Sequence, residues 1–218
     1  MQLGNEKHPR GKALASARRL VPMRTMKMLL FAAALLALGL PLRADNWLEN
    51  GDFNDGINHW YGGGRSPADF ASDNPMEKPD PFTSRGLIIP LKDVDWIKVA
   101  QDFKGKIASG IVTVTYMVSP DFAFSDKKED YINMPDHIGY DGWRSFNTPP
   151  GEWVVFVSDF GSARGTYFSI KPKLGSSAEQ TFRTRLRGLT PLEDKTITLA
   201  FPPGKGTLVV LSVSLTDN

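Results

Sequence analysis

The amino-acid sequence predicts an all-β protein: a β-sandwich of the jelly-roll type, formed by a single domain. Three features lead to this fold class. Several segments alternate apolar and polar residues with the period of two that strands require, and clusters of Pro and Gly separate them at short intervals. No segment keeps apolar residues at helical spacing over three turns. About eight or nine strands at this spacing are typical of a sandwich.

The clearest alternation is found in residues 110–118, 195–201 and 206–216. Such segments bury one face and expose the other. We therefore expect the following side chains to point inward: Val112, Val114, Tyr116 and Val118 in the first segment, Ile197, Leu199 and Phe201 in the second, and Val209, Leu211, Val213 and Leu215 in the third.

Weaker strand patterns complete the predicted sandwich, and turn residues separate them. The remaining strand segments are 85–91, 96–103, 152–157, 166–173 and 180–188. We expect the first two of these to be a neighbouring pair. The turn signals are the Pro- and Gly-containing stretches at 79–81, 104–106, 148–151 and 202–206.

Two long irregular segments, 62–81 and 120–150, interrupt the strands. The first is rich in Gly, Pro, Asp and Ser, and the second combines aromatic with acidic residues. Loops of this length in a compact domain are usually functional or disordered, and disordered segments are poor in aromatic residues. We therefore expect 120–150 to be ordered at least in part.

The beginning of the chain has the pattern of an export signal. Residues 28–40 form an uncharged apolar stretch that follows Lys27, and the small residue Ala44 comes shortly after it. A basic flank, a short apolar stretch and a small-residue exit describe a secretory signal peptide. A retained membrane anchor is the alternative, although a comfortable membrane span needs about 20 apolar residues.

This pattern divides the chain into three parts, with cleavage expected after Ala44. We predict a mis-assigned N-terminal extension at 1–25, a signal peptide at 26–44 and a β-sandwich domain at 45–218. The pair Arg18-Arg19 leaves a twin-arginine signal open. The mature protein is expected to be secreted or periplasmic, and no longer attached to a membrane.

Charge and cysteine content limit the partners of the mature domain. Met1–Ala44 holds eight of the 26 basic and one of the 24 acidic residues, so 18 basic and 23 acidic residues remain and the formal net charge is −5. An acidic domain is not expected to bind nucleic acid or an anionic membrane. Without cysteine there is no disulfide, and the hydrophobic core alone must stabilise the exported domain.

The stretch "NWLENGDFNDGINHW" (46–60) resembles the first strand of the carbohydrate-binding modules of families four, nine, sixteen and twenty-two. The residues that match are Asn50, Gly51, Phe53, Gly56 and Trp60. Further matches are Val213-Ser214-Leu215 in the last strand, Gln101 in "WIKVAQDFKG" and the opening Trp153 of "GEWVVFVSDF". The resemblance implies a galactose-binding-like jelly roll whose first and last strands lie side by side.

On this reading several of the matching residues are structural. Phe53 is expected to fill the core, Gly56 to take a positive φ in a turn after Asp55, and Trp60 to fold back as a plug. Trp153 is also taken as structural.

We expect no cofactor and doubt a structural calcium. The resemblance implies a calcium site with an acidic residue after the Phe and aspartates in the last strand. This sequence has Asn54, Leu211 and Ser212 at those places, and hard cations prefer several carboxylate oxygens. Compensation by Asp52 or Asp217 is left open.

The sequence favours a binding protein over an enzyme. It lacks a Gly-x-Ser-x-Gly elbow, a cysteine nucleophile, a phosphate-binding loop and a His-Glu-x-x-His zinc motif. It also lacks the Glu-x-Asp-x-x-Glu strand of some jelly-roll glucanases. A hydrolase or lyase with two unrecognised carboxylates stays as an alternative.

Aromatic platforms with planar polar neighbours are what sugar binding requires. The candidate ligand-binding residues are Trp96, Tyr61, Tyr140 and Trp143. The competing interpretation is that Trp96 and Trp143 pack the long loop onto the sheet. Arg183, Arg185 and Arg187 form a same-face stripe that suits an acidic glycan or simply a solvated face.

Together these features predict an exported, non-catalytic carbohydrate-binding-like module whose partner is a polysaccharide or glycan. The alternative is a structural or protein-interaction β-sandwich of the cell envelope that does not bind sugar.

Overall fold

The computed structural model describes residues 45–69, 83–93, 95–132, 148–160, 165–191 and 194–217. The chain divides into two compact units, Met1–Arg43 and Ala44–Asn218. The predicted extension at 1–25 and signal peptide at 26–44 lie outside the described residues. Among the residues that are described, no helix is long and apolar enough to cross a membrane.

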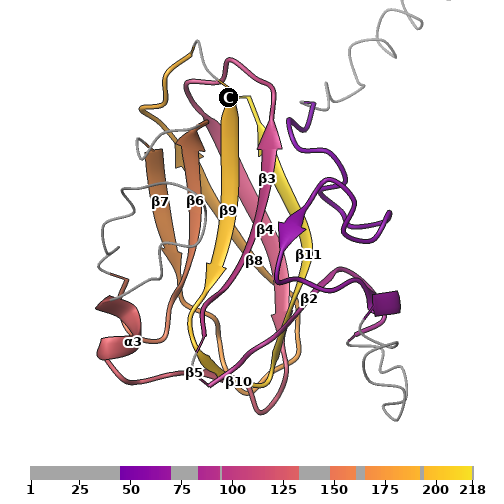
Figure 1. Cartoon of the computed structure of the whole chain (residues 1–218), viewed down its shortest axis with the longest axis vertical. Coiled ribbons are helices and arrows are strands. Elements are labelled where there is room, and N and C mark those ends of the chain that lie inside the picture. The colour runs from indigo at the N-terminus through magenta and orange to yellow at the C-terminus, as the bar shows by residue number, and fades with distance from the viewer. Residues whose placement is uncertain are drawn as a thin grey trace, which may run out of the picture. The chain divides into compact units, whose positions relative to one another are not determined.

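Two antiparallel sheets face each other, and Figure 1 shows the larger one in front of the smaller. The five-stranded sheet has the order β1 (Tyr61–Gly62), β3 (Ile97–Phe103), β9 (Lys195–Phe201), β6 (Trp153–Asp159) and β7 (Gly165–Ile170). The four-stranded sheet has the order β2 (Leu87–Pro90), β11 (Thr207–Thr216), β4 (Gly110–Val118) and β8 (Gln180–Leu186). The smaller elements are the pair β5 (Ala123–Phe124) and β10 (Gly204–Lys205), and the short helix α3 (Glu129–Ile132). The prediction of an all-β jelly-roll sandwich is confirmed.

The core lies between the two sheets and contains the inward side chains that the alternation predicted for β4 and β9. At its centre Trp153 stacks on Phe201 with ring centroids 4.8 Å apart and meets the edge of Tyr116 at 5.5 Å. Each large side chain buried in this way contributes about 1.5–3 kcal/mol to folding. The structural role predicted for Trp153 is confirmed, because no part of this side chain is exposed.

The N-terminal segment lies beside the last strand, as the resemblance implied. The Trp47 amide donates to the Leu215 carbonyl at 2.9 Å, and the Val213 amide donates to the Gly51 carbonyl at 2.6 Å. A Cβ atom at Gly51 would lie 2.2 Å from the Val213 carbonyl oxygen, so only glycine allows this approach. The segment itself consists of turns rather than a strand.

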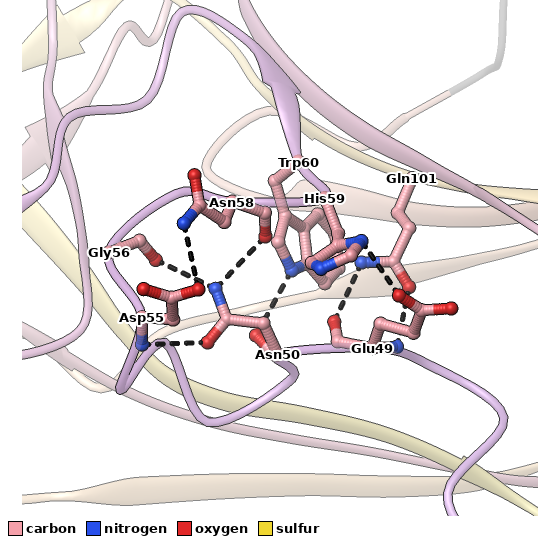
Figure 2. A network of polar contacts seen from close by, with 8 residues as sticks. All are labelled: Glu49, Asn50, Asp55, Gly56, Asn58, His59, Trp60 and Gln101. Carbon is pink, nitrogen blue, oxygen red and sulfur yellow. Dashed lines mark hydrogen bonds and ion pairs between the residues drawn. The ribbon is translucent and has the colours of Figure 1, made fainter.

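The roles predicted within this segment are confirmed. Phe53 and Trp60 are buried with ring centroids 5.3 Å apart, and the Trp60 indole donates to the Asn50 carbonyl at 3.2 Å. Gly56 takes a φ of 58°. Figure 2 shows how the Asn50 amide fixes the turn: it donates to the Gly56 and Asn58 carbonyls and accepts from the Asp55 amide.

Gln101 ties the same segment to the five-stranded sheet. Its side-chain amide accepts from the Glu49 amide at 2.9 Å and donates to the Glu49 carbonyl at 2.8 Å, and it is almost completely buried. A buried amide that satisfies both backbone groups of one residue holds that residue in place. The matching Gln is therefore a structural clamp, on the face opposite to Lys98.

The predicted pairing of 85–91 with 96–103 is wrong. β2 pairs with β11 in the four-stranded sheet, whereas β3 pairs with β1 and β9 in the other sheet. The segment "LIIP" is a short apolar run buried on both sides, and such a run carries no alternation that identifies its partner.

The predicted orientation of β11 is half wrong. Val213 and Leu215 point into the core, but Val209 and Leu211 belong to a separate apolar cluster with Ile88 and Met117. The register with β4 shifts between Val210 and Ser212, which marks a β-bulge at Leu211. A bulge inserts one residue and so exchanges the two faces of the strand from that point on.

Candidate functional site

The outer face of the five-stranded sheet carries two of the four predicted ligand-binding residues. Tyr61 in β1 pairs with Ala100 in β3. Trp96 lies directly before β3 and has the same parity as Ala100, so both aromatic side chains belong to one face. At about 3.3 Å per residue, Trp96 and Tyr61 are separated by about 13 Å along β3. Tyr140 and Trp143 lie outside the described residues.

Tyr61 offers an exposed ring that is held in a fixed orientation. The side chain is 46% exposed, and its hydroxyl donates to Asp102 Oδ1 at 3.1 Å. Thr196 Oγ1 donates to the same oxygen at 2.6 Å. The small side chain of the paired residue Ala100 does not cover the ring. This combination of a planar apolar surface with an adjacent carboxylate suits a sugar ring bordered by hydroxyl groups.

Trp96 lies between the sheet and the segment around α3. Its indole nitrogen donates to the Asp130 carbonyl at 2.7 Å, and its ring meets the edge of Tyr131 at 6.0 Å. On the sheet side it packs against the buried cluster of Val154, Phe156 and Ala200. Trp96 is only partly buried, yet its polar atom is already satisfied. For Trp96, these contacts agree with the competing interpretation of the sequence, in which this side chain packs the long loop onto the sheet.

Tyr131 anchors that segment from the other side. Its hydroxyl donates to the Ser125 carbonyl at 2.7 Å and accepts from the Gly151 amide at 2.9 Å. Burial raises the pKa of this hydroxyl, which the Gly151 hydrogen bond only partly opposes. The neutral phenol therefore persists over the whole physiological range. Part of the predicted loop 120–150 is thus ordered around Trp96.

A hollow of about 570 Å³ opens next to Trp96 at the edge of the sheet. Charged side chains of both signs line it: Arg65, Lys92, Asp95 and Lys98. The chain enters it through Gly62-Gly63-Gly64, where a Cβ on Gly62 would lie 2.1 Å from the Lys98 carbonyl oxygen. The glycines therefore let β1 lie directly against β3, which places Tyr61 beside Asp102.

Three residues of this face were not among the predicted ligand-binding residues. Lys98 and Asp102 follow Trp96 at intervals of two and so project from the same side of β3. The alternation of "WIKVAQDF" carries this information and could have found both. Tyr167 in β7 lies in the same row of the sheet as Tyr61, through Ala100, Thr198 and Phe156. It is 45% exposed, and only the strand order reveals that it shares the face.

The middle of the face is closed. Ala100, Thr198, Phe156 and Ala200 are all buried, so among the described residues of this face a ligand would reach the exposed side chains along β1 and β3 and the ring of Tyr167. The strip extends over about 20 Å along β3. In order, it presents the aromatic edge of Trp96, the cation of Lys98, the ring of Tyr61 and the carboxylate of Asp102.

The structural calcium that the sequence leaves in doubt would lie at the turn around Phe53, next to the last strand. In the part of the chain that the structure describes, no group of three or more His, Asp or Glu side chains is arranged to hold a metal ion. Asp52, one of the two open compensating residues, accepts from the Asn54 side chain and backbone. Asp217, the other, accepts from the Trp47 indole at 3.0 Å.

No protein-family model and no curated protein matches this chain. Solved structures that resemble it include TmCBM61 in complex with β-1,4-galactotriose, with 12% identity, a TM-score of 0.47, and coverage of 80% of this chain and 100% of that one. A family 16 carbohydrate-binding module gives 9% identity, a TM-score of 0.43, and coverage of 79% and 100%. The CBM22-1 xylan-binding domain of Paenibacillus barcinonensis Xyn10C gives 8% identity, a TM-score of 0.43, and coverage of 80% and 97%.

Proposed function

We propose that this protein is an exported, non-catalytic module that binds a neutral glycan along β1 and β3, on the outer face of the five-stranded sheet. The observation that carries the proposal is the exposed Tyr61 ring, fixed by its hydrogen bond to Asp102 beside the small residue Ala100. A rigid aromatic ring loses little conformational entropy when it stacks on a sugar.

Each residue of the strip has a role in this proposal. Tyr61 stacks on the apolar face of a sugar ring, and Asp102 and Lys98 hydrogen-bond to its hydroxyl groups. Trp96 supports the strip from one end through its contacts with Tyr131 and the sheet. Tyr140 and Trp143 remain predicted additions to the platform. Tyr61 and Thr196 both donate to Asp102 Oδ1, which fixes the orientation of the carboxylate. Its Oδ2 can accept a hydrogen bond from a sugar hydroxyl.

The proposal is tested by electrophoresis of the domain 45–218 through native gels that contain β-glucan, xylan, mannan or β-1,4-galactan. We expect one polymer to retard the wild type. Tyr61→Ala is expected to weaken binding roughly ten-fold to a hundred-fold, if stacking of a sugar on one aromatic ring contributes as much as stacking of a nucleobase, which is about 1–3 kcal/mol.

Two variants sharpen the result. Tyr61→Phe keeps the ring but loses the hydrogen bond to Asp102, so it should bind more tightly than Tyr61→Ala and more weakly than the wild type. Leu174→Ala removes an exposed apolar side chain, 59% exposed, from a distant loop and serves as the matched control. Retardation that Tyr61→Ala leaves unchanged would contradict the proposed strip, and no retardation by any polymer would favour a protein-binding sandwich.

A further inference from the structure

The outer face of the four-stranded sheet differs in chemistry from the strip described above. Across β8, β4 and β11 the register forms three rows: Thr181–Thr115–Ser212, Arg183–Thr113–Ser214 and Arg185–Ile111–Thr216. Eight of these nine side chains are polar, and all nine are at least partly exposed. We call these nine residues the hydroxyl–arginine face.

The polar groups of this face are available for a partner. Arg183 and Arg185 are exposed, and within the described ranges neither has an ion-pair or hydrogen-bond partner. Thr115 and Thr181 approach each other with their hydroxyl oxygens 3.4 Å apart, which aligns them across the two strands. Arg187, the third residue of the predicted stripe, is exposed just beyond the end of β8.

None of the nine residues of this face is acidic. The nearest carboxylate along β8 belongs to Glu179, and Arg85 binds it with the two side-chain atoms 2.5 Å apart. Because Arg85 precedes β2 and Glu179 precedes β8, this ion pair joins the two outer strands of the sheet. The buried apolar cluster of Ile88, Met117 and Val209 borders the face, because Met117 follows Thr115 at an interval of two on β4.

Charge is segregated in the same region. The segment from β7 to the end of β8, residues 165–188, passes from one sheet to the other and holds five of the 18 basic residues of the mature domain and only one of its 23 acidic residues. This segment is therefore positive in a domain of net charge −5. Its lysines, Lys171 and Lys173, are exposed as well.

From this arrangement we propose that the hydroxyl–arginine face binds a carboxylate-bearing polysaccharide. Arg guanidinium groups bind carboxylates through paired hydrogen bonds, and the flat rows of hydroxyls match the hydroxyl groups of the polymer backbone. The face carries no aromatic residue, so it offers nothing for nucleobases to stack on. This site is separate from the Tyr61 strip and does not depend on it.

The test measures binding of the domain 45–218, a compact unit of its own, to polygalacturonate at low salt by affinity electrophoresis and titration calorimetry. Residues 1–44 are left out because their eight basic residues would bind any polyanion. We expect binding that weakens as salt is raised. Arg183→Gln combined with Arg185→Gln should weaken it roughly ten-fold or more, since two charge-assisted contacts are lost.

Matched controls isolate the geometry from the charge. Lys127→Gln with Lys128→Gln removes the same two charges from exposed positions near α3 and should leave binding nearly unchanged. Arg183→Lys with Arg185→Lys keeps the charge but loses the paired hydrogen bonds, so its affinity should be intermediate. Tyr61→Ala should bind polygalacturonate like the wild type, which distinguishes this site from the neutral-glycan strip.

Four outcomes would overturn the proposal: no binding of polygalacturonate by the wild type, equal binding by the double Arg→Gln variant, an equal loss in the double Lys→Gln control, or equal affinity for fully methyl-esterified polygalacturonate. Binding of a DNA duplex as tight as that of polygalacturonate would also overturn it, in favour of unspecific attraction to polyanions. Since the Arg positions are exposed, thermal unfolding should confirm that every variant folds.

Discussion

The two sheets of the sandwich differ in where they place their polar residues. Six strand residues of the described chain are both polar and buried: Gln101, Ser158, Asp159, Lys195, Thr196 and Thr198. All six belong to β3, β6 and β9 of the five-stranded sheet. In the four-stranded sheet the polar residues of β4, β8 and β11 stay at least partly exposed.

This difference follows from how the sheets are covered. An antiparallel sheet that packs on one face and meets water on the other alternates apolar with polar side chains, as β4 and β8 do. β9 is buried along its whole length on both faces. Its Thr and Lys side chains must therefore find partners inside the protein, and the five-stranded sheet depends on internal polar contacts that the other sheet does not need.

The strongest of these contacts joins β6 to β9. Lys195 and Asp159 are register partners, and their charged groups lie 3.1 Å apart with 0% and 1% of the side chains exposed. Lys195 Nζ also donates to the Thr190 carbonyl at 2.7 Å, and the Thr190 amide donates to Asp159 at 3.1 Å. Each charge is thus both paired and hydrogen-bonded.

Breaking this pair should give the largest effect. Lys195→Met leaves the Asp159 carboxylate buried without its counter-ion, and we expect the free energy of unfolding to fall by about 3–5 kcal/mol in urea titrations. Arg85→Gln removes the exposed ion pair of the other sheet and should cost at most about 1 kcal/mol.

The double variant Lys195→Met with Asp159→Leu removes both charges and should recover much of the stability. If Lys195→Met and Arg85→Gln cost the same, the two sheets do not differ in the way that their buried polar residues indicate.

A smaller effect is expected from the edge that places Tyr61. Gly62 has a φ of 120°, and a Cβ there would lie 2.1 Å from the Lys98 carbonyl oxygen. Gly62→Ala should therefore destabilise the domain by about 2–3 kcal/mol and displace β1 from β3. Gly188→Ala is the matched control, because Gly188 also has a positive φ of 81° but nothing lies near its Cβ position. It should cost only about 1 kcal/mol.

For Gly62→Ala, the midpoint of urea unfolding measures the loss of stability. Affinity for the glycan that retards the wild type measures the displacement of β1 from β3. Equal midpoints for the two glycine variants would show that the close approach of β1 to β3 is not what requires glycine there.

Much of this architecture could be predicted because it depends on local pattern. The roles of Phe53, Gly56 and Trp60 followed from the motif that resembles the first strand of carbohydrate-binding modules, and the alternation in β4 determines its inward face. The orientation of Val209 could not be predicted, because the bulge at Leu211 is a feature of the pairing of β11 with β4 and not of the sequence of β11 alone. The partner of β2 could not be predicted either, since a short apolar run fits any buried position.

The candidate site shows the same division. Alternation from Trp96 places Lys98 and Asp102 on one face, and this is visible in the sequence. The shared row of Tyr61 and Tyr167 depends on the strand order of the whole sheet, which joins residues more than 100 positions apart. A residue pattern cannot contain that order, because loops of any length can produce it.

The last expected difference between the sheets is a pH dependence confined to the five-stranded one. Burial alone would raise the pKa of Asp159, but hydrogen bonds from Thr190 and Lys195 outweigh this and lower the pKa below its ordinary value. The folded protein therefore binds fewer protons at this site than the unfolded chain does. The stabilisation is complete above the unfolded pKa of about 3.9 and is lost as the pH falls through the folded pKa.

Urea titrations of the wild type and of Asp159→Asn at pH 7 and at successively lower pH measure this term. The difference in unfolding free energy between them should be constant down to about pH 5 and shrink below that. Glu179→Gln, which removes the exposed carboxylate of the other sheet, should run nearly parallel to the wild type over the same range. A difference for Asp159→Asn that stays constant down to pH 3 would mean that the folded and unfolded states bind protons equally at this site, so that the charge of Asp159 does not stabilise the fold. If Glu179→Gln abolishes the loss of unfolding free energy at low pH to the same extent as Asp159→Asn does, the acid sensitivity belongs to surface carboxylates and not to the buried pair.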